Sequence, residues 1–165
     1  MSQARSFSLS YRVHQDRSSL EKGDLALVEM AEKASKDAYA PYSGFNVGAA
    51  LELDNGEIII GNNQENASFP AGICAERVAI FAAGAQHPGR SVSAISIIAT
   101  SEHINLKEPV PPCGICRQVV AEYEAEQGSA IRVILCAPNG PVHIFNSMKD
   151  LLPFHFHETS LKRDS

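Results

Sequence analysis

Apolar and polar positions along the chain change their spacing several times, and each change predicts an element. In some segments apolar side chains recur three and four positions apart, which is typical of a helix with one buried face. In others they alternate with polar residues or form short continuous runs, which is typical of strands. The helical segments are about 18–39, 74–85, 113–126 and 147–151, and Gly23 weakens the first turn of the first one, which leaves a start nearer Asp24 open. The strand segments are about 46–53, 57–61, 92–100, 131–136 and 141–145.

Turn residues separate these segments and support the assignment. Asp54-Asn55-Gly56 joins the first two strands and is a strong hairpin signal, and Asn139-Gly140 separates the last two. Gly128 follows the third helix, where a glycine commonly ends a helix. Because strands and helices alternate, the chain is expected to form a layered α/β sheet with helices on both faces.

The two ends of the chain carry weaker patterns. In residues 1–17 the side chains of Phe7, Leu9, Tyr11 and Val13 alternate with polar ones, which fits either an extra strand or a disordered extension. We therefore divide the chain into an N-terminal extension (1–17), one folded domain (18–157) and a C-terminal tail (158–165).

Composition and charge exclude several classes of partner. The 165 residues carry a net charge of −5, and an acidic surface repels phosphate backbones, so a nucleic acid polymer is not expected. No segment approaches the roughly 20 apolar residues that span a bilayer, and the N-terminus lacks the apolar core of a signal peptide. We expect a cytoplasmic protein without membrane contact. Its four cysteines are then ligands or buried thiols rather than disulfides.

Three of the cysteines lie where a loop enters a predicted helix, in Cys74-Ala75-Glu76 and in Pro112-Cys113-Gly114-Ile115-Cys116. A C-x-x-C pair alone also fits a redox pair, half of a structural zinc site or coincidence. Helix N-termini stabilise thiolates, however, and three sulfur ligands leave the fourth position of a tetrahedral zinc open. The sequence therefore predicts a catalytic type of zinc site. Cys136 lies in a strand and is expected to be a buried thiol.

Glu76 follows two positions after the first predicted ligand. An acidic residue in the first turn of a helix is normally a surface charge that complements the helix dipole. Here the spacing lets the carboxylate reach the open position of the metal without binding it. That is the place for a general base.

Taken together, the motifs resemble the small, homotetrameric cytidine deaminase family in its three-cysteine class. A metal ligand, one residue and then glutamate, followed later by P-C-x-x-C, is a known signature of zinc deaminases. Further matching stretches extend the resemblance over about residues 20–156. They are 41–50 (PYSGFNVGAA), 63–68 (NQENAS), 74–77 (CAER), 112–118 (PCGICRQ) and 151–153 (LLP).

The resemblance implies a three-layer α/β/α sandwich with a five-stranded mixed sheet. It implies hydrolytic deamination of cytidine and deoxycytidine to uridine and deoxyuridine with release of ammonia, as in pyrimidine salvage. It also implies one Zn²⁺ per subunit and a homotetramer in which the active sites are shared between subunits.

Roles for individual residues follow from the same resemblance. Asn63 and Glu65 are expected to bind the 3′-hydroxyl side of the ribose, Phe45 to contact the pyrimidine face, and Ala75 to contact the substrate. Glu76 is expected to move protons from water to the base and to the departing ammonia.

Two further roles lie outside the substrate contacts of one subunit. Arg77 is expected to donate to the thiolates and offset their charge. A C-terminal phenylalanine is expected to enter a neighbouring subunit's site. Phe156 aligns with it, but the altered tail leaves Phe154 as an alternative.

Three other interpretations compete with this one. A deaminase of a modified cytosine nucleoside such as blasticidin S shares the metal motifs, although residues 63–67 favour an ordinary ribose. A polynucleotide-editing deaminase needs a basic channel and stacking aromatics, and this acidic chain has no Trp. A non-enzymatic zinc module predicts a closed metal site and a dispensable Glu76.

Overall fold

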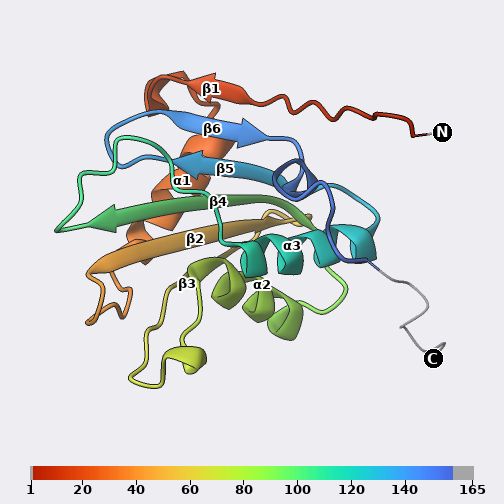
Figure 1. Ribbon diagram of the computed structural model, residues 1–165. Coiled ribbons are helices and arrows are strands. Elements are labelled where there is room, and N and C mark those ends of the chain that lie inside the picture. Colours follow the sequence, from red (N-terminus) through yellow and green to blue (C-terminus); the bar gives the residue numbers. More distant parts are fainter. Residues whose placement is uncertain (1, 158–165) are drawn as a thin grey trace.

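The computed structural model of the protein describes residues 2–157, which form a six-stranded mixed sheet between helical layers (Figure 1). The strand order is β1-β6-β5-β4-β2-β3, and only the β4–β5 pair is parallel among them. The strands are β1 (Arg12–His14), β2 (Phe45–Leu53), β3 (Ile58–Asn62), β4 (Val92–Ser101), β5 (Arg132–Cys136) and β6 (Val142–Phe145). The helices are α1 (Lys22–Ser35), α2 (Ala75–Gln86) and α3 (Gly114–Gln127), with 3₁₀ turns at Arg17–Ser19, Phe69–Ala71 and Met148–Leu151.

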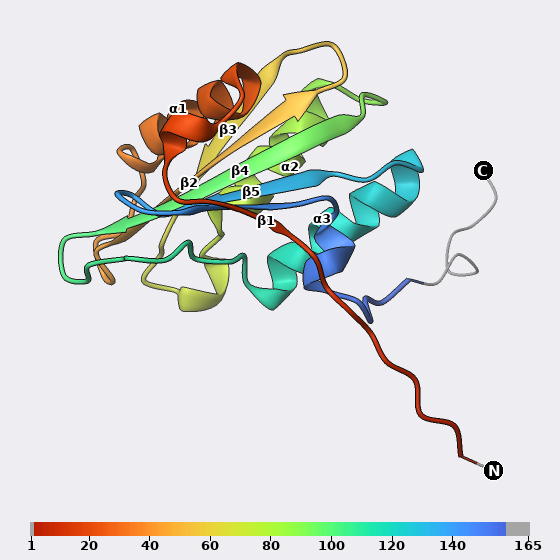
Figure 2. The same ribbon diagram turned by 90° about the horizontal axis from the view of Figure 1, so that it is seen from above.

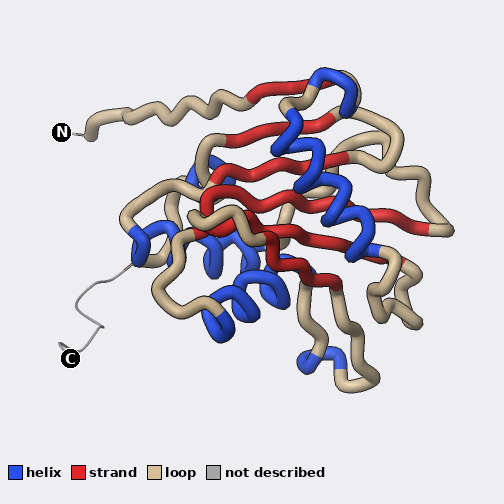
Figure 3. The backbone as a smooth tube through the Cα atoms, turned by 180° about the vertical axis from the view of Figure 1, so that it is seen from behind, coloured by secondary structure: helices blue, strands red, loops and turns tan. Residues whose placement is uncertain are grey.

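Helices cover both faces of the sheet, as the alternation of elements predicted. Helix α1 lies across one face, and α2 and α3 cover the other (Figure 2, Figure 3). The central strands alternate between the two cores that result. In β4, Ile95 and Ile97 pack in the core with α2, whereas Ala94 and Ile98 pack in the core with α1. The expected three-layer α/β/α class is confirmed.

The expectation of five strands is wrong by one, because Arg12–His14 adds β1 to the edge of β6. The alternating pattern of this segment explains the addition. Tyr11 and Val13 share a face with His143 and Phe145, and the Tyr11 ring stacks on Phe145 with centroids 4.9 Å apart. The sixth strand thus comes from within the N-terminal extension expected at 1–17. The tail expected at 158–165 lies outside the described residues.

The first helix is also shorter than the 18–39 expected. Asp16 caps a separate 3₁₀ turn by accepting from the Ser18 backbone N–H at 2.7 Å, so α1 begins only at Lys22. At its other end the chain leaves the helix after Ser35, and Tyr39 bridges to Gln64 instead.

The direction of the strands explains why α2 and α3 begin at the same edge of the sheet. Both β3 and β4 pair antiparallel with β2, so they run in the same direction. Helix α2 follows β3 and α3 follows β4, and both helices therefore begin beyond the carboxyl ends of these strands. In α/β sheets this is the edge where ligands bind.

Gly48 allows α1 to approach the sheet closely, and this contact gives a first prediction. A Cβ at Gly48 would lie 1.9 Å from the Ala31 carbonyl oxygen and 2.5 Å from the Ser35 nitrogen. Because both atoms are backbone, Gly48→Ala must displace α1. We expect the free energy of unfolding, measured by urea denaturation, to fall by about 3 kcal/mol or more.

Gly23→Ala is the matched control for this substitution. Gly23 lies on the exposed side of α1, and a methyl group added there would have nothing within 4 Å. In a helix the change to alanine is expected to stabilise by about 0.5–1 kcal/mol. Equal unfolding midpoints for the two variants would contradict the close packing of α1 on β2.

Candidate active site

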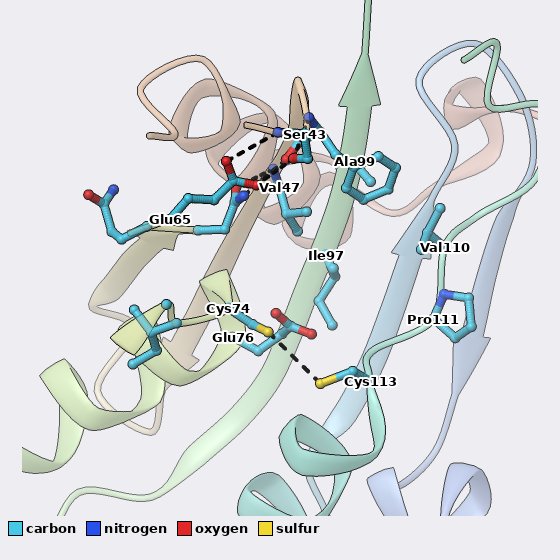
Figure 4. A pocket seen from close by; sticks show the side chains of 15 residues that line it. Ser43, Val47, Glu65, Cys74, Glu76, Ile97, Ala99, Val110, Pro111 and Cys113 are labelled. Carbon is cyan, nitrogen blue, oxygen red and sulfur yellow. Dashed lines mark hydrogen bonds between the residues drawn. The ribbon is translucent and has the colours of Figure 1, made fainter. Parts of the chain in front are cut away.

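A cavity of about 510 Å³ opens where α2 and α3 begin (Figure 4). Its size suits a small molecule. Most of its wall is apolar, and a few polar groups and two sulfurs converge on it. The apolar residues of the wall are Phe45, Val47, Ile73, Ile97, Ala99, Val110 and Pro111. The polar and sulfur-containing side chains are those of Ser43, Asn63, Gln64, Glu65, Cys74, Glu76 and Cys113.

Three sulfur atoms form a cluster at this cavity. The Sγ atoms of Cys113 and Cys116 are 3.5 Å apart and those of Cys74 and Cys113 are 3.9 Å apart, with all three within 4.8 Å of one another. Tetrahedral zinc with sulfur ligands at about 2.3 Å requires sulfurs separated by about 3.8 Å. Cys74 and Cys113 line the cavity, whereas Cys116 is fully buried. The donor set therefore fits zinc with one position facing the cavity.

The local structure favours ionisation of one of these sulfurs. Cys74 and Cys113 are the N-cap residues of α2 and α3. A hydrogen bond from Cys116, aided by Arg77, lowers the pKa of Cys74 to about 5. The same interaction and burial raise the pKa of Cys116. One thiolate is thus stable in the cluster before a metal adds its charge.

Glu76 is in the first turn of α2 and lines the cavity beside the cluster (Figure 4). Its side chain is only 4% exposed, and this burial raises the pKa of the carboxyl group. The charge of Cys74 contributes in the same direction. A raised pKa makes the carboxylate a stronger base, which suits a group that takes a proton from water and passes it on.

Arg77 lies on the outer side of the cluster. Its Nη2 donates to the Cys74 Sγ at 3.8 Å, and this bond raises the pKa of the guanidinium, which stays charged. Three thiolates and Zn²⁺ would sum to −1. A guanidinium at this distance offsets that excess charge.

Asn63 lines the cavity and also holds the start of β2. Its Oδ1 accepts from the Val47 N–H at 2.7 Å, and its Nδ2 donates to the Phe45 carbonyl at 2.9 Å. The second N–H of the amide is available for a ligand. The bonds to β2 were not predicted from the sequence, since they join residues 16 and 18 positions apart.

Glu65 is held at the rim of the cavity by the turn before β2. Its carboxylate accepts from the Ser43 hydroxyl and from the backbone N–H groups of Tyr42 and Ser43, at 2.9 and 3.3 Å. The Ser43 hydroxyl bond is the main cause of its lowered pKa. Glu65 is therefore an ionised acceptor at neutral pH.

The other expected substrate contacts divide into two groups. Phe45 lines the cavity. Ala75 is fully buried and Phe156 is 67% exposed, and neither is part of the cavity wall of its own chain. Phe154 is 92% exposed. The structure thus brings together the three cysteines, Glu76, Arg77, Phe45, Asn63 and Glu65, and leaves the tail aromatics outside.

Sequence reasoning missed several residues of the wall. Ser43 holds Glu65; it lies in the matching stretch 41–50, but no role was assigned to it. Ile97, Ala99 and Val110 form part of the apolar wall. They carry no local signal, because an apolar residue is more often core than ligand contact, whether it lies in a strand (Ile97, Ala99) or in a loop (Val110).

Fold and site together define a class: α/β proteins with three clustered cysteines at two helix N-termini, suited to hold a metal, and a glutamate beside them. The family model described as "Cytidine and deoxycytidylate deaminase zinc-binding region" matches residues 21–130. The chain belongs to this family.

Individual relatives agree with the family match. A cytidine deaminase of Halalkalibacterium halodurans is 42% identical over 76% of this chain and 81% of its own length. The crystal structure of cytidine deaminase from Burkholderia pseudomallei is 41% identical, covers 79% of this chain and 97% of its own, and has a TM-score of 0.69. That from Mycobacterium tuberculosis is 29% identical, covers 81% and 96%, and has a TM-score of 0.62.

Proposed function

We propose that the protein catalyses the hydrolytic deamination of cytidine and deoxycytidine to uridine and deoxyuridine with release of ammonia. The observation that carries the proposal is the buried Glu76 carboxyl group beside three clustered sulfurs, at a cavity with mostly apolar walls. Apolar walls suit a flat, neutral pyrimidine, and the carboxylate at the rim suits a sugar hydroxyl. The relatives named cytidine deaminase point to the same substrate.

Cys74, Cys113 and Cys116 would hold one Zn²⁺ per subunit. When bound, zinc supplies a strong positive charge that makes a water molecule acidic enough to attack at neutral pH. Arg77 offsets the charge of the thiolates and keeps Cys74 oriented through its 3.8 Å contact.

Glu76 would carry out the proton transfers. Its carboxylate takes a proton from the attacking water and gives it to N3 of the pyrimidine, which makes C4 more electrophilic. The water oxygen bonds to C4, and Glu76 then takes the remaining proton of this new hydroxyl and passes it to the amino group, which leaves as ammonia as the C4 carbonyl forms. Burial supports this exchange because it raises the pKa of Glu76 toward the working range. Phe45 would pack on the pyrimidine and exclude water.

Asn63 and Glu65 would bind the ribose, and Glu65→Gln tests this. The ionised Glu65 accepts from a hydroxyl, and a hydrogen bond to a charged group contributes about 1.5–3 kcal/mol. We expect the KM for cytidine to rise at least about tenfold in steady-state assays, since 1.4 kcal/mol is a factor of about ten. Ala75, the other expected substrate contact, would touch the substrate through its backbone, because its methyl group is buried.

A substrate control separates ribose binding from a general loss of structure. With a cytosine nucleoside that lacks the 3′-hydroxyl, the Glu65→Gln change should have little further effect on KM, because the contact is already absent. An equal loss with both substrates would contradict the assignment of Glu65 to this hydroxyl.

The active species would be a homotetramer in which Phe156 completes the cavity of a neighbouring subunit. Its exposed ring, absent from its own cavity, supports this. Light scattering that finds a fully active monomer would overturn it.

In the described part of the chain no helix is long and apolar enough to cross a membrane. We infer a cytoplasmic enzyme of pyrimidine salvage that acts on nucleosides and not on nucleic acid polymers.

A substrate panel tests the function. Purified, zinc-loaded protein should convert cytidine and deoxycytidine, followed by the change in ultraviolet absorbance, and should leave single-stranded cytosine-rich DNA unchanged. Turnover of blasticidin S without turnover of cytidine would replace this proposal by the modified-nucleoside alternative.

A further inference from the structure

The C-terminal segment 151–157 is attached to α3 by two consecutive side chains. Arg117 Nη1 donates to the Leu151 carbonyl at 2.8 Å. Gln118 bonds Phe156 twice: its Nε2 donates to the Phe156 carbonyl at 2.7 Å, and its Oε1 accepts from the Phe156 N–H at 2.9 Å. Figure 2 shows this end of the chain beside α3.

The paired hydrogen bonds of the Gln118 amide select one residue of the C-terminal segment 151–157. They satisfy the donor and the acceptor of a single backbone position, as a neighbouring strand would, and so fix the backbone of Phe156. The ring of Phe156 remains 67% exposed. Gln118 therefore holds the backbone of Phe156 while leaving its ring available to another molecule.

Arg117 connects the same attachment to the loop that leads into α3. Its Nε donates at 2.8 Å to the carbonyl of Pro112, the residue before Cys113. The Arg117 guanidinium thus links Leu151, where segment 151–157 begins, to the start of α3. Segment 151–157 is therefore attached to α3 at two places, by Arg117 at Leu151 and by Gln118 at Phe156.

We propose that Gln118 is a positioning residue, which holds Phe156 in the register needed to enter the cavity of a neighbouring subunit. The inference rests on the proposed function and names the tail residue that acts, since the paired bonds select Phe156 and not Phe154. Gln118 belongs neither to the sulfur cluster nor to the cavity wall among the described residues. Its effect should therefore fall on substrate binding rather than on proton transfer.

The first test compares single variants by steady-state kinetics with cytidine. Gln118→Met keeps the length of the side chain and removes both bonds, and we expect about a fivefold rise in KM with kcat changed by less than about twofold. Phe156→Ala should raise KM at least as much, because a base loses its aromatic contact. Phe154→Ala is the matched control and should leave KM unchanged. The double variant Gln118→Met/Phe156→Ala should be no worse than Phe156→Ala alone.

The outcomes separate the two levels of the proposal. If Phe156→Ala raises KM and Gln118→Met does not, the positioning role is wrong while the shared site stands. If neither changes KM, the shared site is wrong as well. Should Gln118→Met fail to assemble, Gln118→Asn, which keeps the amide but shortens its reach, is expected to give the same rise in KM.

A mixing experiment then asks in which subunit Gln118 acts. Gln118→Met subunits, which retain Glu76, are co-assembled with an excess of Glu76→Gln subunits, which retain Gln118. The active cavities then receive Phe156 from neighbours with an intact attachment, so KM should return to the wild-type value. A KM that stays raised in the hybrids would overturn the proposal, because Gln118 would then act within its own subunit.

Discussion

Glu76→Gln is expected to lower kcat for cytidine by about a thousandfold, within the range that general acid–base catalysis contributes. Glutamine has nearly the same shape as glutamate but cannot take a proton from water or deliver one to the pyrimidine. The three sulfurs are untouched, so zinc content and thermal stability should stay at wild-type values. The spectrophotometric cytidine assay and metal analysis together measure these effects.

The surface residue Glu29 provides the control for this change. It lies on the exposed side of α1, on the opposite face of the sheet from the cavity, and Glu29→Gln removes the same charge from the chain. This variant should keep full activity. If Glu76→Gln also keeps full activity, the assignment of the proton transfers to Glu76 is wrong. If neither the wild type nor the variant acts on cytidine while zinc is bound, a closed zinc module becomes the better account.

Cys113→Ala is expected to weaken zinc binding by more than about a hundredfold, because even partners behind the ligands contribute ten- to hundredfold. Its Sγ lies 3.9 Å from Cys74 and 3.5 Å from Cys116, so its loss removes the sulfur that links the other two. Deamination should become undetectable. Bound zinc stabilises only the folded state, so at excess zinc the unfolding free energy should fall by about 2.7 kcal/mol or more.

Zinc per subunit, chelator competition and thermal unfolding with and without chelator measure these changes. Cys136→Ala is the control, since Cys136 is also buried but donates to the Ala137 carbonyl at 3.2 Å outside the cluster. It should keep its zinc, and chelator should still lower its melting temperature. A Cys113→Ala protein with one tightly bound zinc would contradict the proposed ligand set.

Most of the fold could be predicted from the sequence, because turns and helix ends depend on only a few neighbouring residues. The Asp54-Asn55-Gly56 turn fixed the first hairpin, and Gly128 ends α3 in the left-handed conformation, with φ of 67°. The extra strand β1 was left open, because the alternation at 7–13 describes one strand but not its partner. Only the contact of Tyr11 with Phe145, which is distant in sequence, decides between strand and disorder.

The candidate site divides in the same way. The cysteines and Glu76 could be identified as candidates from the sequence, because each motif depends on spacing at the start of its own helix: Cys74 and Glu76 at α2, and Cys113 and Cys116 at α3. The bonds of Ser43 to Glu65 and of Gln118 to Phe156 could not, because they join residues 22 and 38 positions apart. Neither serine nor glutamine in such a segment has a spacing that indicates its partner.

Turnover of cytidine in water enriched in heavy oxygen tests the central claim most directly. Zinc-loaded protein should release one ammonia for each uridine formed, and mass spectrometry should find one oxygen from the solvent, at C4 of the pyrimidine. Removal of zinc by a chelator should stop the reaction. Folded, zinc-containing protein that forms no uridine, or uridine without solvent oxygen at C4, would contradict hydrolytic deamination at this site.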